Sequence, residues 1–380
     1  MEIKTVADIN QYTGSSINPL EHPEQLYELY SVPSFETGHP EIVKGKDIGS
    51  TKITVEEGDV LVCKINPRIN RVWVVKHNTE YPLLASSEWI VVRNKNIDSN
   101  YLKWYFSSPT FRTLLNSQVA GIGGSLTRAQ PKQVAKYSVP VPSCSEQQKV
   151  SENLDKVNAL IALRKEQLAK LDRLVKSRFI ELFGEYNHSN NKVFLEEISK
   201  FVTVGIANSA THAYTDSGIV MLRNQNIKEN YLDENDLIYI TPDFAKKYGS
   251  KQLAENDILV IRTGYPGVAC LVPRKYEGCQ TFTTLIVRLK NATSAHANYV
   301  CHYINSSFGK DYVEQSKVGV AQQNFGAKAL AKMPIAIPPM ELQEQFVTFV
   351  EQTDKSKLAI QQSLNKLELL KKSLMHQYFG

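Results

Sequence analysis

The stretch SEQQKVSENLDKVNALIALRKEQLAKLDRLVKSRFIELFG at residues 145–184 has a second copy, ELQEQFVTFVEQTDKSKLAIQQSLNKLELLKKSLMHQYFG, at residues 341–380. The two copies align without a gap at an offset of 196 (380 − 184 = 196). The identities include Gln147 with Gln343, Leu168 with Leu364, Lys170 with Lys366, Leu171 with Leu367, Leu174 with Leu370, Lys176 with Lys372, Ser177 with Ser373, and Phe183-Gly184 with Phe379-Gly380. Because each copy closes a segment of similar length, the sequence indicates a duplicated architecture.

Apolar residues recur in both copies at alternating spacings of three and four, which is the pattern of a coiled-coil seam. The predicted seam residues are Val150, Leu154, Val157, Ile161, Leu168, Leu171 and Val175 in the first copy, and Phe346, Val350, Ile360, Leu364, Leu367 and Leu374 in the second. A helix of about 38 residues would be about 57 Å long. Each helix would expose an apolar stripe alone, so each needs a partner.

Helix start and stop signals flank the two copies. Prolines precede both, Ser143 and Glu146 can form a capping box, and Gly184 lies where a C-cap is expected. The partner of each helix could be a second chain, since a heptad stripe is often a homodimerisation coil. The duplication favours the other copy in the same chain. We then expect an antiparallel coiled coil with a pseudo-two-fold axis between the repeats.

The segments before the helices have the features of two diverged α+β domains. Asp59-Val60-Leu61-Val62 matches Asp257-Ile258-Leu259-Val260 at an offset of 198, as Tyr101 and Tyr105 match Tyr299 and Tyr303. We also align residues 43–48 with 222–227 at an offset of 179, which implies 19 extra residues (198 − 179 = 19) in the second copy. One helix is expected over residues 101–117 and another over 299–315. The predicted organisation is a domain at 1–142, a helical spacer at 143–186, a domain at 187–338 and a helical spacer at 339–380.

Composition places the chain among ordinary globular proteins. It has 380 residues, 42% apolar and 22% charged, with a formal charge of +5 that permits an anionic partner without requiring one. No apolar run is long enough to span a membrane, and the start Met1-Glu2-Ile3-Lys4 lacks a signal-peptide pattern. The five cysteines form no CxxC pair, so we expect buried reduced thiols in a cytoplasmic protein.

Motifs for catalysis are scarce. The stretch nearest to an adenine methyltransferase motif, Asn66-Pro67-Arg68-Ile69, lacks the second proline and the aromatic residue, and no GxxxxGK loop is present for ATP. The glycines at residues 121–124 follow a predicted helix, which favours a plain turn over a phosphate cradle. The eight histidines form no HxxxH or HExxH pair, so no metal site is predicted.

The order of domain, long helix ending in Phe-Gly, domain and long helix ending in Phe-Gly resembles the specificity subunit of type I restriction-modification systems. So do the domain exits Val139-Pro140-Val141-Pro142 and Ile335-Ala336-Ile337-Pro338-Pro339, each followed by Gln147 or Gln343. The second exit departs from the usual form, with Leu342-Gln343 where the first has Glu146-Gln147. The resemblance covers essentially the whole chain.

The resemblance implies a non-catalytic subunit that recognises double-stranded DNA. Each domain would be a target recognition domain for one half of a split, asymmetric site, and the helices would hold the two halves apart. Two methyltransferase subunits would bring S-adenosylmethionine and methylate adenines, and restriction subunits with ATP and Mg²⁺ would join them. The chain itself would bind no cofactor.

DNA contacts would then come from basic, amide and hydroxyl side chains on loops. The candidates are Lys44, Lys46, Lys64, Arg68, Arg71, Ser125, Thr127 and Arg128 in the first domain, and Arg223, Asn224, Gln225, Arg262, Tyr265, Lys317, Gln322, Gln323 and Asn324 in the second. Two of these clusters follow the matched Asp-Val/Ile-Leu-Val strands, so we expect them on equivalent loops. Two alternatives remain open: a coiled-coil adaptor without DNA specificity, and a DNA methyltransferase in its own right.

Overall fold

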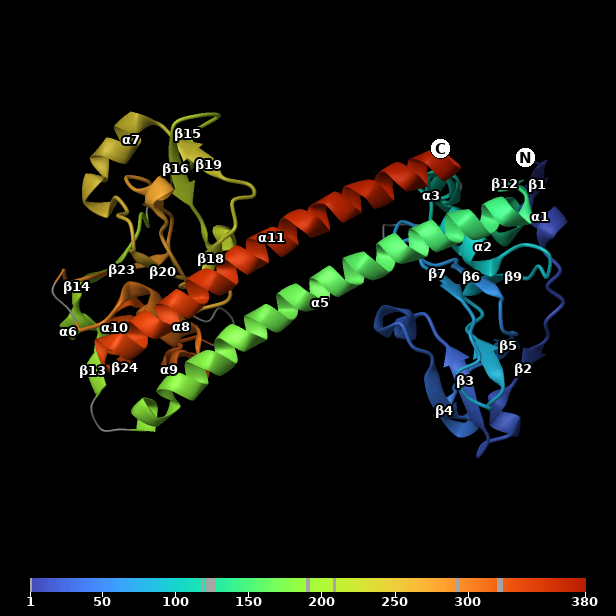
Figure 1. Cartoon of the computed structure of the whole chain (residues 1–380), viewed down its shortest axis with the longest axis horizontal. Coiled ribbons are helices and arrows are strands. Elements are labelled where there is room, and N and C mark those ends of the chain that lie inside the picture. The colour runs from blue at the N-terminus through green and yellow to red at the C-terminus, as the bar shows by residue number, and fades with distance from the viewer. Residues whose placement is uncertain are drawn as a thin grey trace. The chain divides into compact units, whose positions relative to one another are not determined.

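The computed structural model describes residues 2–117, 119–120, 127–188, 192–207, 210–291, 294–319 and 324–380. Contacts divide the chain into two units (Figure 1). Unit 1 comprises Met1–Glu166 and Gln361–Gly380, and unit 2 comprises Gln167–Ile360. The long helices α5 (Cys144–His188) and α11 (Met340–Phe379) each contribute to both units. The predicted single stretches of helix are therefore observed, and each serves two compact bodies.

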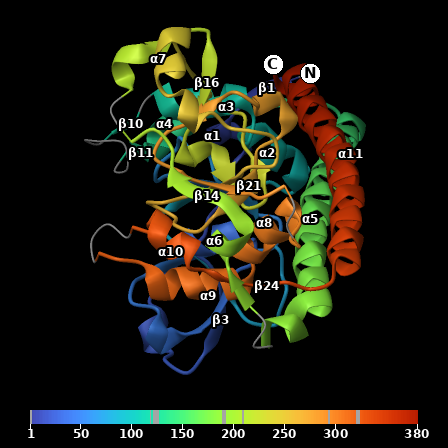
Figure 2. The same cartoon turned by 90° about the vertical axis from the view of Figure 1, so that its left-hand side faces the viewer.

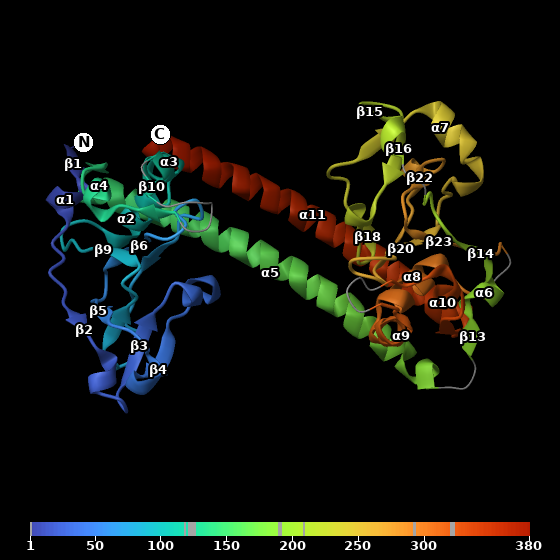
Figure 3. The ribbon, with the colours of Figure 1, turned by 180° about the vertical axis from the view of Figure 1, so that it is seen from behind.

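The globular part of unit 1 combines small sheets with short helices (Figure 3). Its sheets are β1(Glu2–Thr5)-β12(Ser138–Val141), β7(Val72–Val74)-β6(Val60–Cys63)-β9(Trp89–Val92), β2(Ser16–Ile17)-β5(Lys52–Thr54)-β8(Leu83–Ala85)-β3(Leu26–Tyr30)-β4(Glu41–Lys44) and β10(Val119–Ala120)-β11(Arg128–Ala129). Its helices are α1(Val6–Ile9), α2(Ser99–Phe106), α3(Pro109–Ser117) and α4(Pro131–Val134). Unit 1 thus mixes helices and sheets, as predicted.

Unit 2 has a related set of elements (Figure 2). Its sheets are β13(Lys192–Phe194)-β24(Pro334–Ala336), β14(Ser199–Val204)-β23(Leu285–Leu289)-β20(Ile258–Val260)-β21(Ala269–Leu271), β15(Tyr214–Thr215)-β19(Ile238–Ile240)-β16(Ile219–Leu222)-β22(Gln280–Thr281) and β17(Ile227–Lys228)-β18(Tyr231–Leu232). Its helices are α6(Leu195–Ile198), α7(Pro242–Lys247), α8(Ala297–Asn305), α9(Ser307–Ser316) and α10(Ala327–Ala331). The order β21-β20-β23 repeats β7-β6-β9 of unit 1.

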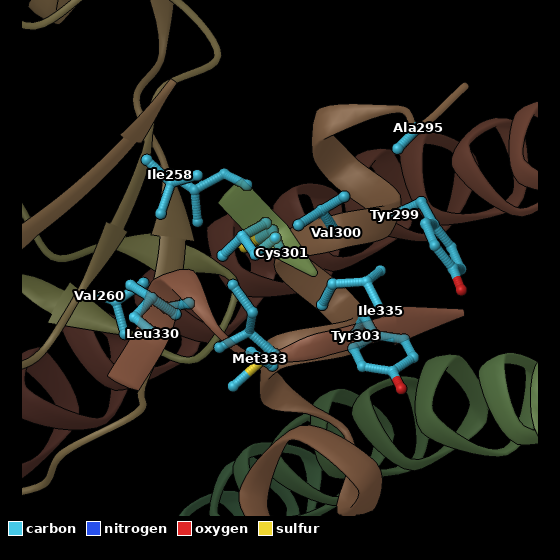
Figure 4. Close-up of a cluster of buried hydrophobic side chains, with 14 of the residues drawn as sticks. Ile258, Val260, Ala295, Tyr299, Val300, Cys301, Tyr303, Leu330, Met333 and Ile335 are labelled. Carbon is cyan, nitrogen blue, oxygen red and sulfur yellow. The ribbon is translucent and has the colours of Figure 1, made fainter. Parts of the chain in front are cut away.

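Each unit joins its domain to the helices through buried aromatic rings. In unit 2, Phe183 of α5 packs on Tyr299 of α8 and on Phe346 of α11, with ring centroids 4.8 and 5.5 Å away. Tyr299 and Tyr303 belong to the apolar cluster drawn in Figure 4. In unit 1, Phe379 of α11 packs on Tyr101 and Tyr105 of α2, each at 5.7 Å. The repeated Phe-Gly ending therefore marks a ring that packs on a domain tyrosine in both units, Tyr299 in unit 2 and Tyr101 in unit 1.

Glutamines at the start of each long helix bind the backbone of the adjacent domain. Gln147 accepts a hydrogen bond from the Asp98 N–H and donates one to the Pro142 carbonyl, both at 2.9 Å. Gln343 accepts from the His296 N–H at 2.8 Å and donates to the Ser294 and Pro338 carbonyls. Because Asp98 and His296 are the N-caps of α2 and α8, the two glutamines fix equivalent junctions.

The boundaries of the long helices confirm one predicted signal and correct another. Ser143 and Glu146 form the predicted capping box, in which the Glu146 carboxylate accepts hydrogen bonds from the N–H and the hydroxyl of Ser143. Gly184 is not a C-cap, because α5 continues past it to His188. A single glycine is tolerated inside a helix that packs as extensively as α5.

Segments of α5 and α11 lie side by side within each unit. In unit 1, Asn153 donates a hydrogen bond to the Tyr378 hydroxyl at 3.0 Å, and Lys371 donates to Asn158 at 2.7 Å. In unit 2, Lys357 forms an ion pair with Asp172 at 2.7 Å. Within unit 1 the residue number rises along α5 as it falls along α11.

The predicted seam residues are buried or half-buried throughout. Val150, Leu154, Val157, Ile161, Val175, Phe346, Val350 and Leu364 are buried, and Leu168, Leu171, Ile360, Leu367 and Leu374 are half-buried. The rings at Phe179, Phe183 and Phe379 and the Met375 side chain are also buried, although the heptad pattern did not include them. They face the domains, so a seam between two helices alone does not predict them.

Two local predictions are wrong. The single helices expected at 101–117 and 299–315 are each broken in two, because Pro109 cannot continue α2 and the Ser306 hydroxyl caps the start of α9. The alignment of 43–48 with 222–227 is also wrong, since β16 pairs in parallel with β22 as β3 does with β8. The Tyr30 and Leu222 carbonyls accept equivalent backbone bonds, from Ser86 and Phe282, so the strand that corresponds to β16 is β3.

All five cysteines are free. Cys63, Cys270 and Cys301 are buried, Cys279 is half-buried and Cys144 is exposed, so the expectation of buried thiols is wrong for Cys144.

Within the parts of the chain that the structure describes, no helix has both the length and the apolar character needed to cross a membrane.

Candidate nucleic-acid interface

The two candidate loops belong to equivalent hairpins. Hairpin 1 comprises β6, residues 64–71 and β7, and hairpin 2 comprises β20, residues 261–268 and β21. The Ala129 N–H donates to the Lys64 carbonyl at 2.9 Å, and the Phe325 N–H donates to the Arg262 carbonyl at 2.9 Å. One residue further along, Ile65 bridges to Arg128 and Thr263 bridges to Asn324. Each hairpin is thus held by the same pattern of backbone bonds to a chain segment about 60 residues later.

Residues with positive φ lie immediately before and after the tip of each loop, at positions that we call its shoulders. Asn66 (φ 47°) and Gly264 (φ 86°) follow the first strand at the same position, and Asn70 (φ 50°) and Gly267 (φ 91°) precede the second. Glycine and asparagine are the residues that adopt this conformation at low cost. The tips between them have different sequences, residues 67–69 in hairpin 1 and residues 265–266 in hairpin 2.

A buried ion pair holds the base of each hairpin. Asp59, just before β6, forms a two-pronged pair with Arg93, and Asp257, just before β20, does the same with Arg288, all N–O distances being 2.7 Å. Both carboxylates are 1% exposed. Their hydrogen bonds are the main cause of the raised pKa of both arginines. Sequence reasoning noted the two aspartates as strand landmarks and missed their partners, which lie about 30 residues away.

Several basic candidates of unit 1 are engaged by carboxylates. Lys44 and Lys46 both pair with Glu24, at 2.8 and 3.0 Å. Hydrogen bonding to Glu24 raises the pKa of Lys44. Arg71 pairs with Glu36 at 2.9 Å. These ion pairs compete with phosphate for the same donors.

The remaining candidates of unit 1 gather around hairpin 1. Lys64 is half-buried at its first strand, and Arg68 is exposed at its tip. Thr127 is buried in the returning segment, where its carbonyl accepts from the Asn66 N–H at 2.9 Å. Arg128, in the same segment, is exposed and pairs with Glu88 at 3.0 Å. Ser125 lies outside the described residues.

Three candidates of unit 2 meet at hairpin 2, namely Arg262, Asn324 and Asn224. The Arg262 Nε donates to Asn324 Oδ1 at 3.0 Å, and the Asn224 amide donates to the Thr263 carbonyl at 3.3 Å. Two more candidates flank Asn224 in the sequence: Arg223 donates to the Asp236 carbonyl, and Gln225 is exposed. The structure therefore places residues 223–225 next to the hairpin loop.

The other candidates of unit 2 differ in their surroundings. Tyr265 is 83% exposed at the tip of hairpin 2. Lys317 pairs with Glu314. Val318, which the prediction did not include, is 74% exposed and bridges to Asn324. Gln322 and Gln323 lie outside the described residues.

Burial strongly shifts the pKa of one histidine in unit 2. Burial, followed by the nearby Lys357 charge, lowers the pKa of His302 to about 3, so its imidazole is neutral near pH 7. His302 packs against the Phe346 ring at 5.1 Å. Among the described residues, no group of three or more His, Cys, Asp or Glu side chains could hold a metal ion.

A comparison with protein families supports the duplicated architecture of the chain. Residues 8–173 and 187–369 each match the family model described as "Type I restriction modification DNA specificity domain". The two matches together cover most of the chain, and each includes one domain and most of the helix that follows it.

Curated relatives match over three quarters of the chain. The type I restriction enzyme StySPI specificity subunit of Salmonella potsdam is 23% identical over 319 residues, which are 75% of this chain and 65% of the relative. The EcoKI specificity subunit of Escherichia coli strain K12 is 19% identical over 307 residues, 75% of this chain and 66% of the relative. The chain thus spans slightly less than two thirds of the length of these relatives.

Solved structures share the fold. One, described as "Structural basis underlying complex assembly and conformational transition of the type I R-M system", is 16% identical, with a TM-score of 0.62, and covers 100% of this chain and 97% of its own. The S subunit of a type I restriction-modification system from M. genitalium is 10% identical, with a TM-score of 0.55, and covers 100% of this chain and 96% of its own.

Proposed function

Because the chain belongs to the family defined by the type I restriction-modification DNA specificity domain, we propose that it is a non-catalytic DNA-recognition subunit. It reads a split, asymmetric site in double-stranded DNA, with one half-site bound by each domain. The observation that carries this proposal is that both family domains contain the same hairpin held by the same backbone bonds, while the residues at the tips differ. A shared scaffold with different tips suits a protein that reads two unlike sequences.

The proposed architecture follows from the repeat. Residues 1–142 and 187–338 are target recognition domains, and residues 143–186 and 339–380 are spacers that pair as an antiparallel coiled coil with pseudo-two-fold symmetry. The contacts of α5 with α11 inside each unit support this pairing, as does the burial of the seam residues. The paired helices set the distance between the half-sites.

The proposed partners supply the chemistry. Two methyltransferase subunits dock on the helical spacers and adjoining domain surfaces, carry S-adenosylmethionine and methylate adenines. Restriction subunits, with ATP and Mg²⁺, act in the same cytoplasmic complex. The names of the relatives, which are specificity subunits, support a chain that binds none of these cofactors itself.

Selection from a pool of random duplexes tests the recognition function. The full chain, assembled with the methyltransferase subunit from the same genome, should enrich one split sequence with a gap of fixed length. Binding should fall steeply with salt, because contacts to phosphates release counterions. An adaptor without DNA specificity would enrich no sequence and would bind DNA weakly at every salt concentration, and either result would refute the proposal.

Helix insertion tests the spacer. Seven residues added to α5 after Glu166 and seven added to α11 after Ile360 preserve the phase of the seam. They lengthen the helix pair by about 10 Å, or about three base pairs of DNA. The recognised gap should grow by about three base pairs. A gap of unchanged length would contradict the spacer role, and insertion into α5 alone is the control that mismatches the two helices.

A further inference from the structure

We propose that the tips of hairpins 1 and 2 determine which bases each half-site contains, with Arg68 and Tyr265 as the specificity-determining residues. This inference rests on the proposed function and assigns it to two short loops. Hairpin 1 would read one half-site and hairpin 2 the other. The surrounding candidates then hold the hairpins or contact the DNA backbone.

The hairpins are presented by the same scaffold in both units. Each strand pair starts at a buried aspartate bound by arginine, and each loop is tied by a backbone bond from Ala129 or Phe325. A fixed scaffold holds side chains within the small tolerance that reading base edges requires. At the hairpins, the two units therefore share the scaffold and differ in the tips that it presents.

The shoulders of each loop restrict the path of the tip. In hairpin 1 the Asn70 side chain donates to the Phe106 carbonyl at 3.0 Å, and the Ile69 N–H donates to the Asn66 carbonyl at 3.0 Å. In hairpin 2, Gly267 packs so closely on Val313 that a Cβ there would lie 2.8 Å from its methyl groups. The backbone of each tip is therefore held at its ends, and only a few side chains extend from it.

Three side chains at the two tips are exposed. Arg68 and Ile69 are exposed at tip 1, and Tyr265 is exposed at tip 2. Among the described residues, no carboxylate or hydrogen-bonding group contacts the Arg68 guanidinium or the Tyr265 hydroxyl. Arg71, Arg128 and Arg262, by contrast, are each held by a neighbour. A side chain that reads a base needs its donors free before DNA arrives.

The chemistry of the tips differs in a way that predicts different bases. An arginine fork donates two parallel hydrogen bonds to O6 and N7 of guanine in the major groove. A tyrosine ring offers apolar contact to the methyl group of thymine, and its hydroxyl bonds to either a donor or an acceptor. Half-site 1 should therefore contain a guanine read by Arg68, and half-site 2 a thymine contacted by Tyr265.

Base preference measured by duplex selection tests the assignment. The full chain with its methyltransferase subunit is compared with the Arg68→Ala and Tyr265→Ala complexes. Arg68→Ala should relax discrimination at one base pair of half-site 1 by about ten- to hundredfold and leave half-site 2 unchanged. Tyr265→Ala should relax one position of half-site 2 only. Arg68→Lys, which keeps the charge but not the fork, should also relax half-site 1.

Matched controls separate base reading from general binding. Lys95→Ala removes an exposed positive charge from unit 1 that is not a DNA candidate, and Tyr231→Ala removes an exposed tyrosine from unit 2. Both controls should keep the base preference at every position. Thermal unfolding of each complex verifies that the variants fold.

The outcomes distinguish this inference from the function on which it rests. If the unmodified complex selects a split site and both tip variants keep its base preference within twofold, the tips are not the reading elements. If either tip variant alters both half-sites, the assignment of one tip to one half-site is wrong. If the unmodified complex selects no split site, the proposed function fails first.

Discussion

Units 1 and 2 share the groups that fix their backbones and differ in the groups that face outward. The aspartate-arginine pair, the helix-start glutamine and a phenylalanine ring that packs on a domain tyrosine occur in both. The hairpin tips do not match. Structural groups with buried partners are therefore retained between the copies, whereas exposed tips have diverged.

The units also differ at one buried position. In unit 1, Trp104 donates to Asp155 at 2.9 Å, with Lys103 and Lys371 over its ring. The residue at the same place in α8, at an offset of 198, is His302 (302 − 104 = 198). It borders a cavity of ≈ 280 Å³ in unit 2. The smaller, titratable ring gives unit 2 a response to pH that unit 1 lacks at this position.

The largest difference in stability loss between the two units should come from substitution of the aromatic rings near the ends of the repeated helical segments. Phe183→Ala should cost unit 2 about 3 to 5 kcal/mol, because Phe183 is 1% exposed and contacts Tyr299, Phe346 and Phe179. Phe379→Ala should cost unit 1 less, about 2 to 3 kcal/mol, because this ring is more exposed. Native-state hydrogen exchange of α8 and α2 measures each unit separately. Equal losses in both units would contradict the comparison.

Loss of the aspartate-arginine pair at the start of each hairpin should lower the free energy of unfolding by a smaller amount. Asp257→Ala leaves the Arg288 guanidinium hydrogen-bonded to the Gln252 carbonyl and with no ion-pair partner among the described residues, whereas Asp59→Ala leaves Arg93 paired with Glu56 at 2.8 Å. We expect losses of about 2 to 4 and about 1 to 3 kcal/mol respectively. Denaturant unfolding of the full chain checks the order. A larger loss for Asp59→Ala would show that Glu56 does not compensate Arg93.

The helix-start glutamines should give a smaller difference. Gln343 makes three hydrogen bonds to the backbone and Gln147 makes two. Gln343→Leu should destabilise unit 2 by about 1 kcal/mol more than Gln147→Leu destabilises unit 1, the net value of one hydrogen bond. Hydrogen exchange at the first turns of α8 and α2 reports the effect. Substitution of exposed Gln148 is the control and should change neither unit.

The contribution of His302 to the pH dependence of stability should be the smallest effect, and this group belongs to unit 2. The pKa of His302 falls from an ordinary 6.5 to about 3 on folding, so the unfolded chain binds a proton between these values and the native chain does not. His302 therefore contributes its full stabilisation above about pH 6.5, and this contribution is lost as the pH falls toward 3. Between pH 7.5 and 5.5 the free energy of unfolding should fall by about 1 kcal/mol because of this group. His302→Gln should remove this part of the pH dependence. If the variant and the parent lose the same stability over that range, His302 is not the group responsible.

Sequence reasoning succeeded where a pattern is local and repeated. The heptad spacing predicted both long helices, and the Asp-Val/Ile-Leu-Val matches located the first strand of each hairpin. The repeat also located Phe183 and Phe379, but not what they contact. An aromatic ring at the end of a helix has no spacing that reveals a domain surface as its partner.

The errors have physical causes that one sequence does not display. The false match of residues 43–48 with 222–227 arose because a strand followed by a short turn is common, and only the parallel pairing with β8 or β22 identifies the true equivalents. Arg71 was a DNA candidate because its charge is visible, whereas its ion pair with Glu36 depends on the fold. Residue type predicts what a loop can bind; packing decides which side chains remain free.

Exchange of one domain tests the central claim most directly. Residues 187–338 are replaced by the corresponding domain of another family member, with residues 143–186 and 339–380 retained, and the split site is mapped with the same methyltransferase subunit. One half-site should change completely, while the other half-site and the length of the gap stay the same. A chimera that folds and changes both half-sites, or neither, would contradict the account of two independent readers on a common helical spacer.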